Sequence, residues 1–178
     1  MRCLAFDPET CVSIGRRGGI GAIQKTMIAN AASPQVQCEA LGAIKTLASC
    51  SENKGIFQEC HTIDAIVISL WIHNDNEKIQ EAGMMAITNI AVDPKRNEVL
   101  PIKQNHLEPI INAMRRFPQS ESVQEQACIL LRNYTFNTGN IGIMRNNPLL
   151  FECLATALDR HPGKCGNRAN FIIERLFA

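Results

Sequence analysis

Apolar and small residues recur along this chain with the spacing of one helix face. Between residues 36 and 47 they occupy positions i, i+4, i+8 and i+11, which is the pattern of an amphipathic helix. The same pattern returns at residues 79–90 and 123–134. The three stripes are Val36, Ala40, Ile44 and Leu47; Ile79, Gly83, Ile87 and Ile90; and Val123, Ala127, Leu131 and Tyr134. The sequence therefore predicts three long helices, each with one buried stripe.

The three segments are copies of one another. VQCEALGAIKTLA at residue 36 becomes IQEAGMMAITNIA 43 residues later, and VQEQACILLRNYT follows a further 44 residues on. A weaker fourth copy, CGNRANFIIERLF, begins at Cys165. A fixed period of this length is typical of helical solenoids, in which each unit packs only on its neighbours.

Each period holds two further predicted elements. Upstream of every long helix lies a second apolar series, which predicts a second helix that includes Ile20, Ile63, Leu107 or Phe151. Between units lies an Asn-x-x-apolar piece, and we expect it to form a short helix or turn. The three pieces start at Asn53, Asn97 and Asn140.

Polar residues precede the long helices at the same repeat offset. Ser33, Asn76 and Ser120 can accept a hydrogen bond from the free N–H groups of the first turn, so we expect them to be N-caps. Pro34 stands at the first helical position, where its missing N–H costs nothing.

Three helical elements in 42 to 44 residues resemble the armadillo repeat. That family has a second helix opened by Gly-Gly-Ile and a third helix reading roughly Gln-x-x-A-x-x-A-L-x-N-L-A. The matching residues here are Gly18-Gly19-Ile20, Val36-Gln37, Ala43, Leu47-Ala48, Ala86, Asn89-Ile90-Ala91 and Arg132-Asn133-Tyr134. HEAT repeats share the two-helix unit, but the short extra piece and the third-helix Asn favour armadillo. The resemblance implies an all-α fold, a right-handed α–α superhelix of about four repeats.

We expect a single domain over residues 1–178, with a partial repeat at 1–17 and repeats at about 18–60, 61–104, 105–147 and 148–178. The run LAFDP at residues 4–8 matches IAVDP at 90–94, so the chain is expected to begin at the tail of a third helix. At the other end we expect an apolar set to be poorly covered, which would suit a fragment of a longer solenoid or end-to-end self-association. This set is Phe171, Ile172, Ile173, Leu176 and Phe177.

Composition narrows the class of protein. The 178 residues are 46% hydrophobic and 20% charged, with a net charge of +1, which suits one soluble domain and argues against nonspecific nucleic-acid binding. The chain lacks a signal-peptide run and a bilayer-length apolar stretch. Its eight cysteines include no CxxC pair, so they are not a disulfide framework. We expect a reduced intracellular location, cytoplasmic or nuclear.

The repeat period also locates the face opposite the buried stripe. Residues 39, 42, 46 and 49 and their equivalents lie roughly 140° to 220° around the helix from Ile44. Apolar side chains share this face with a polar column, which consists of Thr46, Asn89, Asn133 and Arg175. The predicted partner-binding residues are Glu39, Thr46, Met85, Asn89, Val92, Gln126, Ile129, Asn133, Phe136, Arg168, Phe171 and Arg175.

The armadillo resemblance implies a role for this face. In that family it lies along a concave groove, and Asn residues at the positions of Asn89 and Asn133 hydrogen-bond the backbone of an extended peptide. A carboxamide offers both a donor and an acceptor, which matches one peptide unit. Thr46 and Arg175 depart from this pattern. For Met85 the alternative is edge-to-edge packing of neighbouring third helices, and the same holds for Ile129.

Two features bear on the kind of peptide. The family's nuclear-import adaptors place a Trp four residues before each such Asn, and those positions here are Gly42, Met85, Ile129 and Phe171, so a basic localisation signal is not expected.

Charge on this face is sparse, with Glu39 near one end and three arginines near the other. Arginine forks bind carboxylate or phosphate in bidentate fashion, so this half could orient an acidic or phosphorylated peptide. The arginines are Arg132, Arg168 and Arg175.

Catalysis has weak support in the sequence. Cys60 is next to His61, but sequence adjacency rarely gives the geometry of a nucleophile and its base. The four histidines form no HxxxH or HExxH motif, and the Gly18–Gly21 run follows no strand. We therefore expect no catalytic residue, cofactor or metal.

The predicted function is a non-enzymatic protein-interaction module without membrane contact. The alternatives are a scaffold segment that acts through its ends and, third, a nucleic-acid-binding helical repeat.

Overall fold

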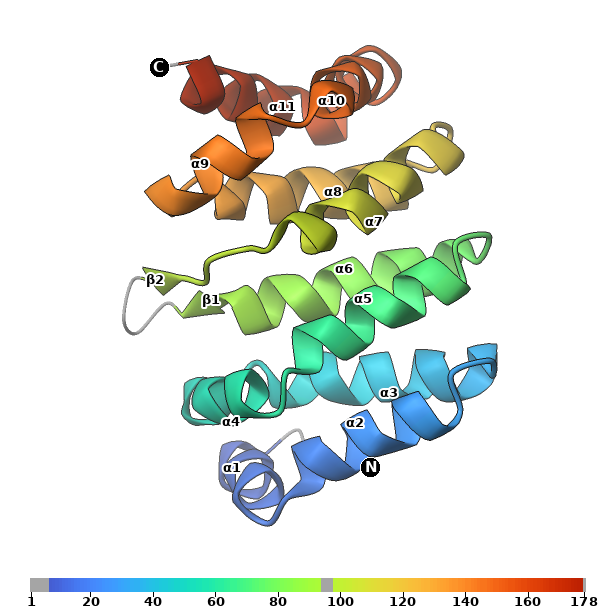
Figure 1. Cartoon of the computed structure of the whole chain (residues 1–178), viewed down its shortest axis with the longest axis vertical. Helices are drawn as coiled ribbons and strands as arrows, with labels where there is room; N and C mark the ends of the chain where they lie inside the picture. The colour runs from blue at the N-terminus through green and yellow to red at the C-terminus, as the bar shows by residue number, and fades with distance from the viewer. Residues whose placement is uncertain (1–6, 94–97, 178) are drawn as a thin grey trace.

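The computed structural model describes residues 7–93 and 98–177, and almost all of its regular structure is helical. Figure 1 shows the helices stacked in successive layers from α1 at one end to α11 at the other. The elements are α1 (Pro8–Arg16), α2 (Gly19–Ala29), α3 (Pro34–Leu47), η1 (Ser51–Asn53), α4 (Lys54–Glu59), α5 (Thr62–Ile72), α6 (Glu77–Ala91), β1 (Val92–Asp93), β2 (Glu98–Val99), α7 (Gln104–Arg116), α8 (Glu121–Tyr134), α9 (Thr138–Arg145), α10 (Pro148–Arg160) and α11 (Pro162–Phe177).

The long helices form two rows. The second helices of the units, α2, α5, α7 and α10, follow one another on the near side of Figure 1, and the third helices, α3, α6, α8 and α11, follow one another behind them. Each third helix packs on the third helix of the next unit and on the second helix of its own unit. This arrangement confirms the predicted all-α solenoid.

The predicted helix starts are confirmed. The side-chain oxygens of Ser33, Asn76 and Ser120 each accept a hydrogen bond from the backbone N–H three residues later, at 3.4, 3.3 and 3.2 Å. Pro34 occupies the first helical position of α3. Free N–H groups in the first turn need such partners, so these residues fix where the third helices begin.

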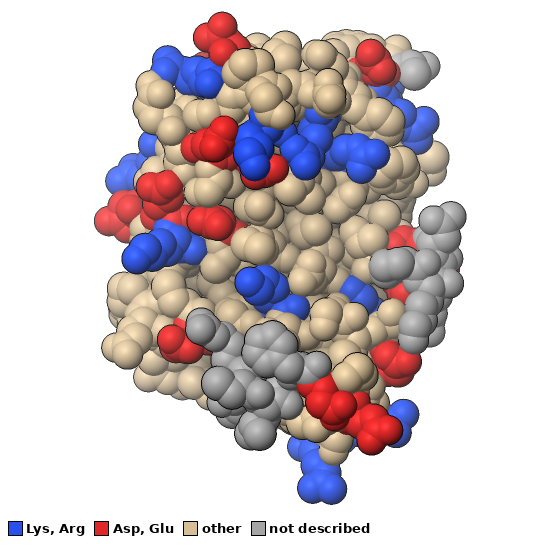
Figure 2. Space-filling view, turned by 180° about the vertical axis from the view of Figure 1, so that it is seen from behind, with Lys and Arg blue, Asp and Glu red and all other residues tan. Residues whose placement is uncertain are grey.

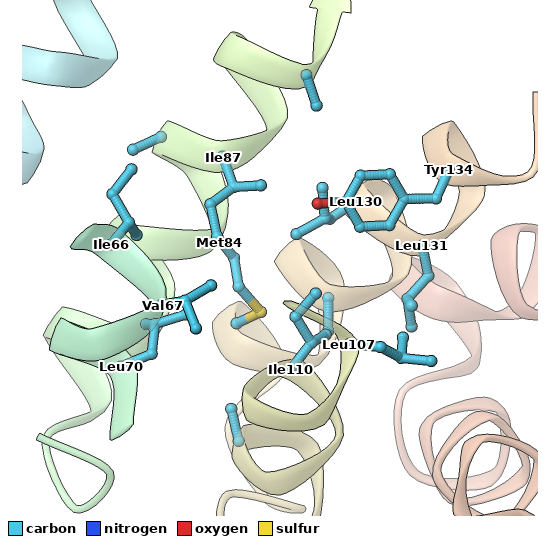
Figure 3. Close-up of a cluster of buried hydrophobic side chains, with 14 of the residues drawn as sticks. Ile66, Val67, Leu70, Met84, Ile87, Leu107, Ile110, Leu130, Leu131 and Tyr134 are labelled. Atoms are coloured by element: carbon cyan, nitrogen blue, oxygen red, sulfur yellow. The ribbon is translucent and has the colours of Figure 1, made fainter. Parts of the chain in front are cut away.

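The core runs between the two rows of helices. Figure 3 shows apolar side chains from α5 and α6 meeting those from α7 and α8 in one continuous cluster, with Met84 reaching across the boundary between units. Tyr134 is 1% exposed, and burial raises the pKa of its hydroxyl. Met84, Ile87, Leu130 and Leu131 are fully buried. Each unit therefore buries its apolar face against its neighbours, as a solenoid requires.

Short elements close the units, but not in the same way each time. Asn53 at the end of η1 donates to the Leu47 carbonyl at 3.0 Å, and Asn140 in α9 donates to the Tyr134 carbonyl at 3.1 Å. Both amides are fully buried, and both pieces are helical as predicted. Asn97 lies outside the described residues. The next residues contradict the prediction of a short helix or turn, because Glu98–Val99 pairs antiparallel with Val92–Asp93 as a strand.

The C-terminal helix is better covered than predicted. Ile172 and Leu176 are fully buried, Phe171 and Ile173 are half-buried, and only Phe177 of the expected set is well exposed, at 67%. The expectation of a poorly covered apolar end is wrong, because α11 turns its stripe onto α8 and α10. Its outer side carries the exposed residues Asn167, Asn170 and Glu174. None of the described helices is long and apolar enough to cross a membrane.

Candidate functional site

The third helices together form one broad face of the molecule, which we call the third-helix face. Figure 2 views this face and shows a hollowed middle, with Lys and Arg side chains gathered above and below it and acidic side chains mainly toward the margins. The face is built by α3, α6, α8 and α11, whose buried stripes turn toward the second helices. The residues opposite those stripes therefore point outward, as the periodicity predicted.

Most of the predicted partner-binding residues lie here, and most are only half-buried. Neighbouring third helices pack side by side, so part of each outward side chain is covered by the next unit. The half-buried members are Thr46, Met85, Asn89, Val92, Gln126, Ile129, Asn133, Arg168 and Phe171, and the exposed members are Glu39, Phe136 and Arg175.

Two predicted members stand apart from the rest. Val92 follows the last residue of α6 and pairs with Val99 in the small antiparallel ladder, so its backbone is extended rather than helical. Glu39 lines a hollow of about 360 Å³ at the N-terminal end of the stack, between α2 and α3. The extended backbone of Val92 does not follow from the helical periodicity of its segment.

The two asparagines of the polar column have different surroundings. The amide nitrogen of Asn89 donates to the Lys45 carbonyl at 3.1 Å, which ties α6 to α3. The backbone carbonyl of Asn89 accepts a hydrogen bond from the ammonium of Lys54. In contrast, the Asn133 side chain has no hydrogen bond to any residue that the structure describes. Asn89 thus ties two units together, whereas the donor and acceptor of the Asn133 side chain are not used within the described part of the chain.

An aromatic pair and an arginine lie close to Asn133. The rings of Phe136 and Phe171, from adjacent units, have centroids 5.7 Å apart. The guanidinium carbon of Arg132 lies 5.2 Å from the first centroid and 4.9 Å from the second. A cation over aromatic faces at this distance is attracted by the ring quadrupoles. We call Arg132, Phe136 and Phe171 the arginine platform.

The other predicted arginines are more engaged. Arg168 lies 3.5 Å from the carboxylate of Glu125, which Lys164 also approaches at 3.6 Å. Arg175 is exposed, and one of its terminal nitrogens donates to the Thr135 carbonyl at 3.4 Å. Arg168 is therefore partly neutralised, whereas Arg175 has a carbonyl as its partner and stays exposed.

Sequence reasoning placed Arg132 among the charges of the groove but not among the binding residues, and it missed Lys45 and Lys54. Lys54 is 6% exposed, and desolvation lowers the pKa of its ammonium despite the opposing charge of Asp93. The signal for Arg132 was its position beside Asn133 in the repeat alignment. No comparable signal existed for Lys54, because its place depends on how η1 turns into α4.

Three titratable side chains, Asp64, Lys103 and His106, form a compact cluster on α5 and at the start of α7. Asp64 of α5 accepts hydrogen bonds from His106 at 2.8 Å and Lys103 at 3.0 Å, beside a cavity of about 210 Å³. Burial raises the pKa of Asp64, but these hydrogen bonds and charges outweigh it, so the net effect is a lowered pKa. Among the described residues, no group of three or more His, Cys, Asp or Glu side chains is arranged to hold a metal ion.

Two of the buried thiols, Cys11 and Cys153, are poor nucleophiles. Burial raises the pKa of Cys11 to about 12 and that of Cys153 to about 11. The thiolate is the reactive form, and at neutral pH almost none of either group is ionised. These two cysteines therefore serve packing rather than chemistry.

Comparison with known proteins agrees with this architecture. A family model described as the LRRK2 ARM repeat matches residues 22–147, which is well over half of the chain. No curated protein matches the chain. The matched segment contains most of α2 and every element from α3 to α9, including three of the four third helices. The chain belongs to the LRRK2 ARM repeat family of armadillo-type helical repeats.

Proposed function

We propose that this protein is a non-enzymatic interaction module that binds an extended peptide of a partner protein along its third-helix face. Families of this type typically act as helical scaffolds for protein contacts. The single observation that carries the proposal is the amide of Asn133, which has no hydrogen-bond partner among residues 7–93 and 98–177 and lies beside the arginine platform. A peptide there meets a hydrogen-bonding group and apolar surface together.

Polar and apolar groups of this site contribute to peptide binding in different ways. The Asn133 amide can donate to one peptide carbonyl and accept from one peptide N–H. Each such hydrogen bond contributes about 0.5 to 1.5 kcal/mol, so it orients a peptide without holding it alone. Phe136 is 49% exposed and supplies the aromatic surface that peptide side chains can cover.

The proposal is tested by selecting peptides from a random display library on the wild-type protein. We expect enriched sequences whose binding falls about tenfold in Asn133→Ala, because two hydrogen bonds are lost. The matched control is Asn170→Ala, since Asn170 is an exposed amide on the outer side of α11. Melting temperatures of both variants exclude unfolding as the cause.

Two outcomes would contradict the proposal. A selection that enriches no sequence would show that the protein binds no extended peptide from the library. Enriched peptides that bind Asn133→Ala as tightly as the wild type would place the binding site elsewhere.

A second candidate function, a scaffold segment acting through its ends, is favoured by the hollow at the N-terminal end of the stack. Its lining is mostly small and apolar, with Ala22, Ile23, Val36, Ala40 and Ala43 beside the polar Thr26, Gln35 and Glu39. In the next unit Ala65 and Ser69 take the places of Ala22 and Thr26, and both are buried under the preceding repeat. Another helical unit would cover this hollow in the same manner.

Sedimentation velocity tests this second candidate. If the end associates, the mass of the wild type rises with concentration, whereas Ala22→Arg stays monomeric because a charged side chain fills the hollow. Asn170→Arg at the opposite, polar end is the control and should behave as the wild type. A monomeric wild type at every concentration would speak against association through this end.

A further inference from the structure

We propose that the bound peptide carries an anionic side chain, a carboxylate or a phosphoryl group, and that Arg132 receives it. This inference rests on the proposed function, and it names the chemistry of the ligand at the same site. It is carried by the arginine platform together with the distribution of charge over the third-helix face.

The side chain of Arg132 is restrained by its surroundings before any ligand binds. Its guanidinium lies over the rings of Phe136 and Phe171, at 5.2 and 4.9 Å from their centroids, and the residue is half-buried at the junction of α8 and α11. Aromatic contacts restrain the long side chain without using its N–H donors. A ligand that binds there therefore meets a side chain whose conformational freedom is already reduced.

The donors of Arg132 are unused within the described part of the chain. No carboxylate there lies within ion-pair distance of it, and none of its nitrogens has a hydrogen-bond partner. The nearby acid on α8, Glu125, is already approached by Lys164 and Arg168. A half-buried guanidinium with five free donors is matched best by an oxyanion that accepts two parallel hydrogen bonds.

The surrounding charges favour the same ligand. Arg175 is exposed on the adjacent helix α11, and Figure 2 shows further Lys and Arg side chains below the hollowed middle. Glu39 is at the far end of the stack, in the hollow between α2 and α3. An anion that approaches this face is attracted, and a cationic segment is repelled.

The platform is a single feature and not a repeated one. Its arginine is replaced by Lys45, Thr88 and Glu174 at the equivalent positions of the other third helices. The position of Phe136 holds Ser49 or Val92 in the earlier units. The site therefore predicts one anionic anchor in the peptide, with no periodic run of acidic residues.

The test uses three synthetic peptide libraries that differ only at one fixed central position, which is Glu, phosphoserine or Gln, and measures binding by fluorescence anisotropy. On the wild type we expect the two anionic libraries to bind about tenfold more tightly than the neutral one, as a charge-assisted hydrogen bond implies. Arg132→Gln should abolish that preference. The comparison of the Glu and phosphoserine arms identifies which anion the site prefers.

Two further variants serve as controls for the effect of Arg132→Gln. Arg116→Gln removes an exposed arginine from α7, in the other row of helices, and should leave the preference unchanged. Arg132→Lys keeps the charge but not the planar fork, so it should retain part of the preference and show that the loss in Arg132→Gln is not unfolding.

The outcomes separate this inference from the proposed function. Equal binding of all three libraries, unaffected by Arg132→Gln, would overturn the anionic anchor and leave peptide binding standing. No binding of any library would overturn both. Tighter binding of a single-stranded oligonucleotide than of every peptide library, lost in Arg132→Gln, would overturn the peptide as the partner class.

Discussion

At the scale of single residues, the turn into the second helix shows how backbone conformation constrains the sequence. Gly18 precedes α2 with φ of 82°, and His61 precedes α5 with φ of 52°, so both are left-handed. Glycine adopts this conformation freely, whereas a residue with a Cβ is strained by about 1 kcal/mol or more. His61 holds the glycine position of the repeat at some cost to stability.

This difference predicts opposite effects of two exchanges. Gly18→Ala should lower the free energy of unfolding by about 1 kcal/mol, although the new methyl group meets no atom within 4 Å. His61→Gly should raise it by roughly 0.5 kcal/mol, because relief of strain exceeds the entropy that glycine adds to the unfolded chain. Urea denaturation measures both. A stabilising Gly18→Ala would contradict this explanation of the turn.

The sequence predicted single-residue roles where they are local and not where they depend on neighbouring units. Ser33, Asn76 and Ser120 were recognised as caps because a cap needs only the next three residues. The different surroundings of Asn89 and Asn133 could not be read from their shared motif position. What separates them is the Lys45 carbonyl of another unit, which only the packed structure brings within reach of Asn89.

At the scale of helices, buried glutamines join the second and third helix of each of three units. Gln37, Gln80 and Gln124 are each 1% exposed, and each side-chain nitrogen donates to two carbonyls at the end of the preceding helix. The last carbonyls of a helix have no partner within it. The Gln of the repeat motif therefore acts as a C-terminal cap supplied by the following helix.

Replacement of Gln80 tests this bridge. Gln80→Leu should cost about 2 kcal/mol, because the Leu70 carbonyl, now bonded at 3.0 Å, would lose its side-chain donor. The His73 carbonyl, now bonded at 2.8 Å, would keep only the backbone N–H of Asn76. Gln104→Leu on exposed α7 surface is the control and should change stability little. Equal unfolding free energies for wild type and Gln80→Leu would show that the bridge contributes nothing.

Asp64 connects neighbouring second helices and makes stability depend on pH. Its hydrogen bonds with His106 and Lys103 lower its pKa in the folded state, although burial alone would raise it. A lowered folded pKa gives stability that is fully present above the unfolded value of about 3.9 and is lost as pH falls through the folded value. We therefore expect Asp64→Asn to lose less stability than the wild type on acidification below about pH 4.

The measurement is a set of urea denaturation curves at descending pH for the wild type and Asp64→Asn. The two curves of stability against pH should converge toward acid, since only the wild type loses the stabilisation that ionised Asp64 provides. Curves that stay parallel through the acid range would contradict the assignment of Asp64.

The elements themselves were predicted well where the repeat is regular. The apolar stripes located α3, α6 and α8, because a helical period is visible in the sequence. The prediction was wrong around residues 98–99, where the chain forms a strand that pairs with Val92–Asp93. Pairing between backbone groups leaves no comparable period in two-residue strands, so the repeat alignment alone could not indicate it.

At the scale of the whole molecule, the two ends of the stack differ in chemistry. Met84 and Cys128 are buried between neighbouring third helices, and the equivalent residue of α11, Asn170, is exposed. The opposite end presents the mostly apolar hollow between α2 and α3. In a solenoid an outer polar side makes an end compatible with water, and an apolar hollow suits a further helical unit.

We propose that a partner peptide binds the third-helix face at α8 and α11. The most direct measurement is hydrogen–deuterium exchange of the whole chain with and without a peptide enriched in the selection. We predict slower exchange confined to α8, α11 and the residues that join α8 to α9. Protection at α2 and the N-terminal hollow, or along the second helices, with α8 and α11 unchanged, would contradict the claim.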